Sequence, residues 1–335
     1  MPAISILDLC RVTEASDARA ALDNARDLAA HAEGWGYTRF WLAEHHNMPG
    51  IASAATSLVI QHVAAGTKTI RVGAGGIMLP NHAPIVVAEQ FGTLARLFPD
   101  RIDLGLGRAP GTDGLAVQAL RRSLINPDDF PRDVLEIQAY FAPAQPGQRL
   151  QAVPAAGAEV PLWILGSSTY GAQLAAQLGL PYAFASHFAP ELLLTALDIY
   201  RQRFEPSEQQ ATPYVMVGVN IIAADTDAEA RRLATTQQMS WANIFRGQRG
   251  LSQPPIDDIE SYWTPAEKAQ AQRMLARSVH GSVDTIRSWI SALVEETGAD
   301  ELIIVSDVYD HAARLRSFEL IAEATCGDRL RKPAT

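Results

Sequence analysis

Side chains suited to acid–base chemistry and ligand binding follow several apolar runs of this 335-residue chain, each time on the C-terminal side of the run. The groups are Glu44-His45-His46-Asn47, Gly75-Gly76, Gly107-Arg108, Gly166-Ser167-Ser168, Ser186-His187 and Ser306-Asp307. Parallel strands that close into a barrel bring their C-terminal ends to one face, and barrel active sites lie there. This one-sided placement predicts an enzyme site at that face.

The Glu44-His45-His46 group is a candidate for acid–base chemistry. Imidazole titrates near neutral pH, so one of these histidines would suit proton transfer or hydrogen bonding to a ligand. A surface turn with capping histidines is the alternative. A metal site is not expected, because adjacent side chains on an extended chain point to opposite sides and no third ligand has suitable spacing.

Two glycine-containing groups and one arginine suit a flat, phosphorylated ligand. Gly75-Gly76 permits close approach of the backbone to a planar ligand, or an unusual peptide geometry, although tight packing alone would also explain it. Arg108 offers a guanidinium for a phosphate or carboxylate, with a surface ion pair as the alternative. Gly166-Ser167-Ser168 places hydroxyls and N–H groups at a predicted helix start, which suits a phosphate as well as an ordinary N-cap.

Other nucleotide and hydrolase motifs are missing from the sequence. The run from Gly105 to Gly111 follows a strand, but Pro110 occupies the sixth position of the Gly-x-Gly-x-x-Gly pattern, which disfavours a dinucleotide fold. Neither Gly-x-x-x-x-Gly-Lys-Ser/Thr nor Gly-x-Ser-x-Gly occurs. The signatures of nucleotide hydrolysis and of serine esterases are therefore lacking.

The composition is that of an ordinary large enzyme, with 47% hydrophobic and 19% charged residues and a formal net charge of -9. An acidic chain without a Lys/Arg stripe is not expected to bind nucleic acid or an anionic membrane. The two cysteines, Cys10 and Cys326, form no Cys-x-x-Cys pair, so we expect no disulfide framework and a cytoplasmic location. Neither a signal peptide nor a membrane span is expected.

Apolar, β-branched runs alternate with Ala/Leu-rich segments of helical spacing, which predicts an α/β protein with a parallel sheet. The expected strands are Ile4–Leu9, Arg39–Ala43, Thr69–Ala74, Arg101–Leu106, Leu162–Leu165, Tyr182–Ala185, Tyr214–Ala223 and Leu302–Val305. Eight strands with following helices close a (β/α)8 TIM barrel. We expect one domain over residues 1–335, with an open doubly wound sheet as the alternative.

Two connections are too long for plain loops. They are Ala109–Phe130 after the fourth strand and Arg246–Gly281 after the seventh strand and its helix. Long excursions in a compact domain are usually functional or disordered. Both would suit a lid over the mouth of a barrel, and Arg246–Gly281 is the candidate lid.

Four ordered motifs resemble those of the bacterial luciferase-like, flavin-dependent monooxygenases. They are Phe40–His46 at the second strand, Val72–Pro80 with its continuation to Pro84 at the third, Arg101–Arg108 at the fourth, and the late turn Val279–Ser282. The similarity extends from about Ile4 to Ala324 in matching order. Four motifs in order are far more specific than any one of them.

The resemblance implies a (β/α)8 barrel with a flavin lying across the strand ends, and often a homodimer. It implies that His45 is the catalytically important histidine and that Gly75-Gly76 carries a non-proline cis peptide beneath the isoalloxazine ring. It also implies that Arg108 and the Gly166-Ser167-Ser168 segment bind the flavin phosphate. Gly107 stands where luciferases carry a reactive cysteine, and Gly166 itself replaces an acidic residue, so we expect a non-luminescent relative.

On this basis we expect a two-component monooxygenase that oxidises a small organic substrate with O2. Reduced FMN would come from a separate flavin reductase, since the chain has no convincing nicotinamide fingerprint. His45 would hydrogen bond or donate a proton during oxygen activation, with Glu44 and His46 as partners.

Three other functions stay open at this point. A deazaflavin (F420)-dependent oxidoreductase would use the same scaffold. A flavin-binding protein without turnover would need no substrate. A metal-dependent hydrolase built on His45, His46 and Asp307 is the least favoured, because the ligand spacing does not support it.

Overall fold

Eight parallel strands close into a barrel in the computed structural model, which describes residues 1–109, 111, 114–120 and 129–326. The barrel strands are β1 (Ala3–Asp8), β2 (Arg39–Leu42), β3 (Arg71–Met78), β4 (Ile102–Gly107), β5 (Leu162–Gly166), β6 (Tyr182–Phe184), β7 (Val215–Ala223) and β9 (Glu301–Val305). Neighbours pair in the order β1 to β7, and β9 closes the ring between β7 and β1. The (β/α)8 barrel predicted from the sequence is confirmed.

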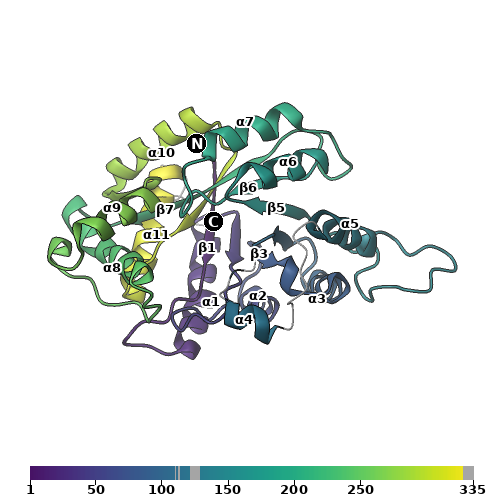
Figure 1. Cartoon of the computed structure of the whole chain (residues 1–335), viewed down its shortest axis with the longest axis horizontal. Coiled ribbons are helices and arrows are strands. Elements are labelled where there is room, and N and C mark those ends of the chain that lie inside the picture. The colour runs from purple at the N-terminus through teal and green to yellow at the C-terminus, as the bar shows by residue number, and fades with distance from the viewer. Residues whose placement is uncertain (110, 112–113, 121–128, 327–335) are drawn as a thin grey trace, which may run out of the picture.

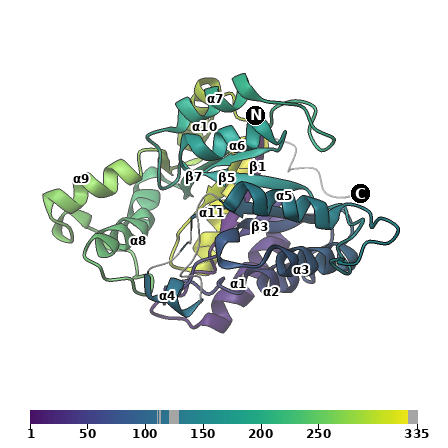
Figure 2. The ribbon, with the colours of Figure 1, turned by 45° about the vertical axis from the view of Figure 1, so that its right-hand side comes forward.

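Helices surround the strands on all sides in both views (Figures 1 and 2). They are α1 (Ala18–Gly34), α2 (Thr56–Ala64), α3 (Pro84–Leu97), α4 (Gly114–Ala119), α5 (Phe130–Phe141), α6 (Thr169–Gln177), α7 (Leu193–Arg203), α8 (Asp227–Phe245), α9 (Pro265–Met274), α10 (Val283–Thr297) and α11 (His311–Cys326). Two short 3-10 turns, η1 (Leu79–Asn81) and η3 (Ile259–Ser261), lie in the connections. None of these described helices combines the length and apolarity needed to cross a bilayer.

Local sequence explains where several helices begin and end. The Asp17 side chain accepts from Ala20 N at the start of α1, and Thr226 accepts from Glu229 N at the start of α8. Pro84 occupies the first turn of α3, as predicted, where a missing N–H costs nothing. Gly298 ends α10 with a φ of 58°, a left-handed conformation that glycine adopts without a Cβ clash.

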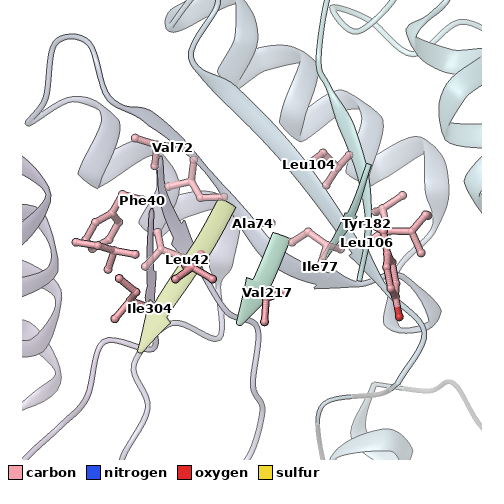
Figure 3. Close-up of a cluster of buried hydrophobic side chains, with 14 of the residues drawn as sticks. Phe40, Leu42, Val72, Ala74, Ile77, Leu104, Leu106, Tyr182, Val217 and Ile304 are labelled. Atoms are coloured by element: carbon pink, nitrogen blue, oxygen red, sulfur yellow. The ribbon is translucent and has the colours of Figure 1, made fainter. Parts of the chain in front are cut away.

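Side chains alternate along the barrel strands between an outer and an inner core. Outward residues such as Phe40, Leu42, Val72 and Leu104 pack beneath the helices (Figure 3). Inward residues form a second cluster inside the barrel, made of Leu7, Trp41, Ala43, Trp163, Ala183, Met216, Ile303 and Val305. The barrel is therefore a filled core, and ligands must bind at its ends.

A network of charged side chains fills the N-terminal end of the barrel. Arg39 Nη1 lies 2.8 Å from Asp103 Oδ2, and its Nε lies 3.1 Å from Glu301 Oε1. Arg71 Nη2 lies 2.7 Å from Asp103 Oδ1, and the Tyr214 hydroxyl donates to Glu301 at 3.0 Å. Both carboxylates are fully buried. Their multiple partners offset the loss of water, and the network closes this end of the barrel.

The segment Arg246–Gly281, expected to be a lid, is largely built into the fold. It contains η3, α9 with a complete Thr264–Glu267 capping box, and an unpredicted strand β8 (Ser278–Gly281). Strand β8 pairs with Asn220–Ala223 of β7, beyond the point where the short β6 stops pairing with that strand. The expectation of one continuous lid is wrong, because the end of the segment belongs to the sheet. Of the other long connection, the structure describes α4 and little else.

Candidate active site

The C-terminal end of the barrel, called the mouth below, collects polar residues from all eight strands. They are Arg11 after β1, Glu44, His45 and His46 after β2, Gly75 and Gly76 on β3, Arg108 after β4, Gly166, Ser167 and Ser168 at the end of β5, His187 after β6, Asn220 on β7 and Asp307 after β9. Every site residue predicted from the sequence lies at this end. The strand topology brings them together from positions far apart in the chain.

Glu44 is the centre of a hydrogen-bond cluster between β2 and β3. Its side chain is only 1% exposed. The carboxylate accepts from His46 Nε2 at 2.8 Å, His82 Nε2 at 2.9 Å, Asn81 Nδ2 at 3.1 Å and the Met78 backbone N–H at 2.9 Å. Burial raises the pKa of Glu44, but the hydrogen bonds and positive charge of His82, with those from Asn81 and His46, outweigh it and lower the pKa. Glu44 therefore acts as an ionised anchor for this side of the mouth.

A cis peptide bond joins Gly75 and Gly76 on β3, as the family resemblance implied. A Cβ at Gly75 would lie 2.7 Å from Leu7 Cδ1, and a Cβ at Gly76 would lie 2.6 Å from the Gly105 carbonyl oxygen. Both distances are too short for real atoms, so this part of the mouth is backbone with no room for side chains. We refer to Gly75 and Gly76 as the glycine floor.

Arg108 and the start of α6 form a second, cationic part of the mouth on the next two strands. The Arg108 guanidinium lies 4.0 Å from the centroid of the Tyr170 ring, in the first turn of α6. Ser168 occupies the N-cap position of α6, but its hydroxyl makes no capping hydrogen bond. Its carbonyl oxygen accepts from the Tyr182 hydroxyl at 3.1 Å, which fixes the turn. A hydroxyl, free helix N–H groups and a guanidinium thus lie close together.

His45 has an imidazole that is neutral at physiological pH. Its Nδ1 is buried and has no hydrogen-bond partner among the described residues. Burial, assisted by the positive charge of Arg11 and only partly opposed by Glu44, lowers the pKa of His45 to about 4. His45 is therefore a neutral hydrogen-bond donor or acceptor rather than a stored proton.

Arg11, Asp307 and His187 lie on the opposite side of the mouth, and the sequence gave them no role. Arg11 binds the Asp307 carboxylate through two contacts, at 3.1 Å and 2.7 Å. It also borders two cavities, one toward Leu251 and one toward Tyr309. Asp307 and His187 follow predicted strands and were visible as candidates. Arg11 had no such signal, because only the fold brings it to a carboxylate 296 residues away.

No three His, Cys, Asp or Glu side chains within the described part of the chain are grouped as a metal ion would require. Glu44, His46 and His82 are instead bound to one another. The hydrolase alternative built on His45, His46 and Asp307 thus gains no support from the geometry.

A sequence model of the luciferase-like monooxygenase family matches residues 3–301 of this chain. The chain belongs to that family. A relative from Escherichia coli (strain K12), named luciferase-like monooxygenase, is 50% identical over 319 residues, which cover 95% of each chain. An N-acetyl-S-alkylcysteine monooxygenase from Bacillus subtilis (strain 168) is 37% identical over 335 residues, covering 96% of this chain and 97% of that protein.

Solved structures agree on the fold of this luciferase-like family member. The crystal structure of apo-MsnO8 superposes with a TM-score of 0.90 at 36% identity, covering 97% of this chain and 98% of that one. The FMN complex of the oxygenating constituent of 3,6-diketocamphane monooxygenase from Pseudomonas putida has a TM-score of 0.73 at 20% identity, covering 97% of each chain. An F420-dependent secondary alcohol dehydrogenase reaches 0.69 at 14% identity, covering 96% and 98%.

Proposed function

We propose that this luciferase-like protein is a two-component monooxygenase that uses reduced FMN and O2 to oxidise a small organic substrate. The observation that carries the proposal is the arrangement of three consecutive strands. The glycine floor on β3 adjoins Arg108 after β4 and the uncapped start of α6 after β5. This order suits a ligand with a flat ring at one end and a phosphate at the other.

Arg108 and the start of α6 would hold the phosphate of FMN. A guanidinium binds phosphate oxygens through charge-assisted hydrogen bonds, and the N-terminus of a helix adds N–H groups and a favourable dipole. Among the described residues, no carboxylate forms an ion pair with Arg108, and its ring contact with Tyr170 leaves its N–H groups for a ligand. The Ser168 hydroxyl, and that of the exposed Ser167, would add further donors.

The glycine floor would accept the isoalloxazine ring against bare backbone. Trp41 supports the floor from below, because a Cβ on Gly75 would lie 3.0 Å from its ring. The floor is held from the side, since the Gly76 carbonyl accepts from the Glu44 backbone N–H at 3.2 Å. Glu44, through its own bonds to His46 and His82, would thus fix the height at which the ring lies.

Reduced FMN would supply electrons for activating O2, and the residues of the mouth would control the surroundings of that reaction. His45, as a neutral imidazole, would offer a hydrogen bond to an oxygen atom or to the substrate. The apolar inner core beneath the glycine floor, including Leu7, Trp41 and Leu165, would keep water away from the ring. A separate reductase and a homodimeric state are part of the proposal.

The substrate that we propose is a small organic molecule with an oxidisable heteroatom. The support is the 37% identical relative that is named for oxidising N-acetyl-S-alkylcysteines. A deazaflavin enzyme remains the second candidate, because the F420-dependent alcohol dehydrogenase has the same fold. Its 14% identity gives no reason to transfer the cofactor, whereas the relatives above 30% identity that carry an activity in their names are monooxygenases.

Anaerobic titration with reduced FMN and with reduced F420, each followed by mixing with O2 in a stopped-flow spectrometer, tests the proposal. We expect saturable binding of reduced FMN and a delayed, protein-dependent return of the oxidised flavin spectrum. Tight binding of reduced F420 with no binding of reduced FMN would support the deazaflavin enzyme instead. Binding of oxidised FMN with no effect on its reaction with O2 would indicate a flavin-binding protein without turnover.

A further inference from the structure

His187 reaches the mouth from the side opposite His45. Its strand, β6, is four places from β2 in the ring of eight barrel strands. The imidazole lies against Gly218 of β7, where a Cβ would come within 2.5 Å of His187 Nδ1. The glycine thus leaves the space that the imidazole occupies. The Phe188 ring packs against it edge-on, with centroids 4.8 Å apart.

Hydrogen bonds from β7 and β8 fix the backbone that carries His187. The His187 carbonyl accepts from Asn220 Nδ2 at 2.6 Å, and the same amide donates to Ser278 Oγ at 3.0 Å. Asn220 Oδ1 accepts from Gln237 Nε2 at 2.9 Å. The Asn220 side chain is therefore fully engaged in holding this turn. The unpredicted strand β8 contributes directly to the position of His187.

Burial determines which nitrogen of each imidazole carries the proton. Nδ1 of His187 and Nδ1 of His45 are both buried without a partner in the part of the chain that the structure describes, whereas Nε2 is not enclosed in this way. A buried N–H without an acceptor is rarer than a buried lone pair without a donor. Each ring therefore has its hydrogen on Nε2. Burial also lowers the pKa of His187 to about 4, although Asp307 opposes it, so both rings are neutral.

The two imidazoles share one space, because the charge of either would affect the other. The other polar groups on this side are already paired. Arg11 and Asp307 bind each other, and Asp8 Oδ1 accepts the ion pair of Arg314 at 3.1 Å. Two Nε2–H donors are thus left at the mouth without a counterpart among the described residues.

We infer that His187 and His45 together bind one oxygen atom of a ligand, through two neutral Nε2–H donors. The ligand group is an acceptor with no proton of its own, namely a carbonyl or carboxylate oxygen of the substrate. Two fixed donors aimed at one oxygen favour such an atom over a hydroxyl or ammonium group. This inference rests on the proposed function for its substrate, but its geometry concerns only the chain's own residues. His187 is thereby a substrate-contacting residue.

Histidine-selective 15N labelling with NMR detection tests the inference on the full chain, with and without FMN. The probes are acetate and acetone as acceptors and methylammonium as a donor. We expect Nε2–H tautomers at both residues, and shifts of both signals on adding acetate or acetone but not methylammonium. In His187→Phe, acetate should bind about tenfold more weakly, the loss of one hydrogen bond, with FMN affinity unchanged.

His187→Gln is the matched control, because its amide can still donate a hydrogen bond from the same position. It should retain more acetate binding than His187→Phe. An Nδ1–H tautomer at His187, or a His45 signal that responds to acetate equally in both variants, would overturn the inference. FMN binding is read separately, so loss of FMN affinity in the unmodified chain would contradict the proposed function and leave the two-donor pair standing.

Discussion

Glu44 shows how a single residue can hold the mouth in shape. Its carboxylate accepts only from donors, two imidazole nitrogens, an amide and a backbone N–H. An amide of the same size would turn a donor toward at least one of them. The charge, rather than the volume, of Glu44 is thus what the site requires.

Glu44→Gln should destabilise the protein by roughly 1–3 kcal/mol at pH 7, the cost of leaving a buried donor unmatched. The pKa of Glu44 is lowered from 4.5 in the folded protein, so its contribution is present above that pH and is lost as the pH falls further. Urea denaturation at pH 7 and pH 4 should therefore show the difference between variant and parent shrinking. Glu159→Gln, at an exposed position, should match the parent at both values.

Arg108→Ala should weaken FMN binding by about ten- to a hundredfold, the worth of a charge-assisted hydrogen bond to phosphate. Riboflavin, which lacks the phosphate, should bind the variant and the parent alike. Fluorescence titration measures both ligands. Arg19→Ala, on the exposed face of α1, is the charge-matched control. Equal losses for FMN and riboflavin would show that Arg108 supports the site in some other way.

At the scale of elements, the junction of β3 and β4 depends on glycine. The register between these strands shifts between Gly75 and Ile77, directly at the glycine floor. The backbones approach so closely there that a single methyl group has no space.

Gly76→Ala should impair FMN binding and lower the melting temperature, because its Cβ would lie 2.6 Å from the Gly105 carbonyl oxygen and 2.5 Å from Leu165 Cδ1. Gly34→Ala, at the end of α1 where a Cβ would meet nothing within 4 Å, should leave both unchanged. Differential scanning fluorimetry with and without FMN compares them. If Gly76→Ala bound FMN normally, the glycine floor could not be the ring site.

Much of the barrel could be predicted because its strands are apolar runs that end in distinctive polar groups. The Gly75-Gly76 cis peptide was implied through the family motif and is present. Strand β8 could not be predicted, since Ser278–Gly281 is four residues long and gains its place only by extending the pairing of β7 where β6 ends. The tautomer of His187 depends on Gly218, and no local pattern records that contact.

For the whole molecule, the charged network at the N-terminal end replaces the apolar plug that a barrel might have used. Arg39 is the link between its two carboxylates, Asp103 and Glu301. Removing one partner from a buried ionic network is far costlier than breaking an exposed pair.

Arg39→Met should destabilise the fold by about 3–5 kcal/mol, since it leaves two buried carboxylates short of a counter-charge. Arg287→Met breaks an exposed pair with Asp284 and should cost less than about 1 kcal/mol. Chemical denaturation gives both values, and Arg39→Lys should fall between them. FMN affinity of folded Arg39→Lys should equal that of the parent, because the network and the mouth lie at opposite ends; a parallel loss would mean that the two ends are coupled.

The charged network also has a kinetic consequence. Since ions and inner-core side chains obstruct one end of the cylinder in the described part of the chain, traffic must use the other. Cofactor, oxygen, reactant and product would then share a single doorway. A guest seated deepest, on bare backbone, must arrive first and depart last. Turnover would therefore follow a compulsory order of entry and exit, set by architecture rather than by relative affinities.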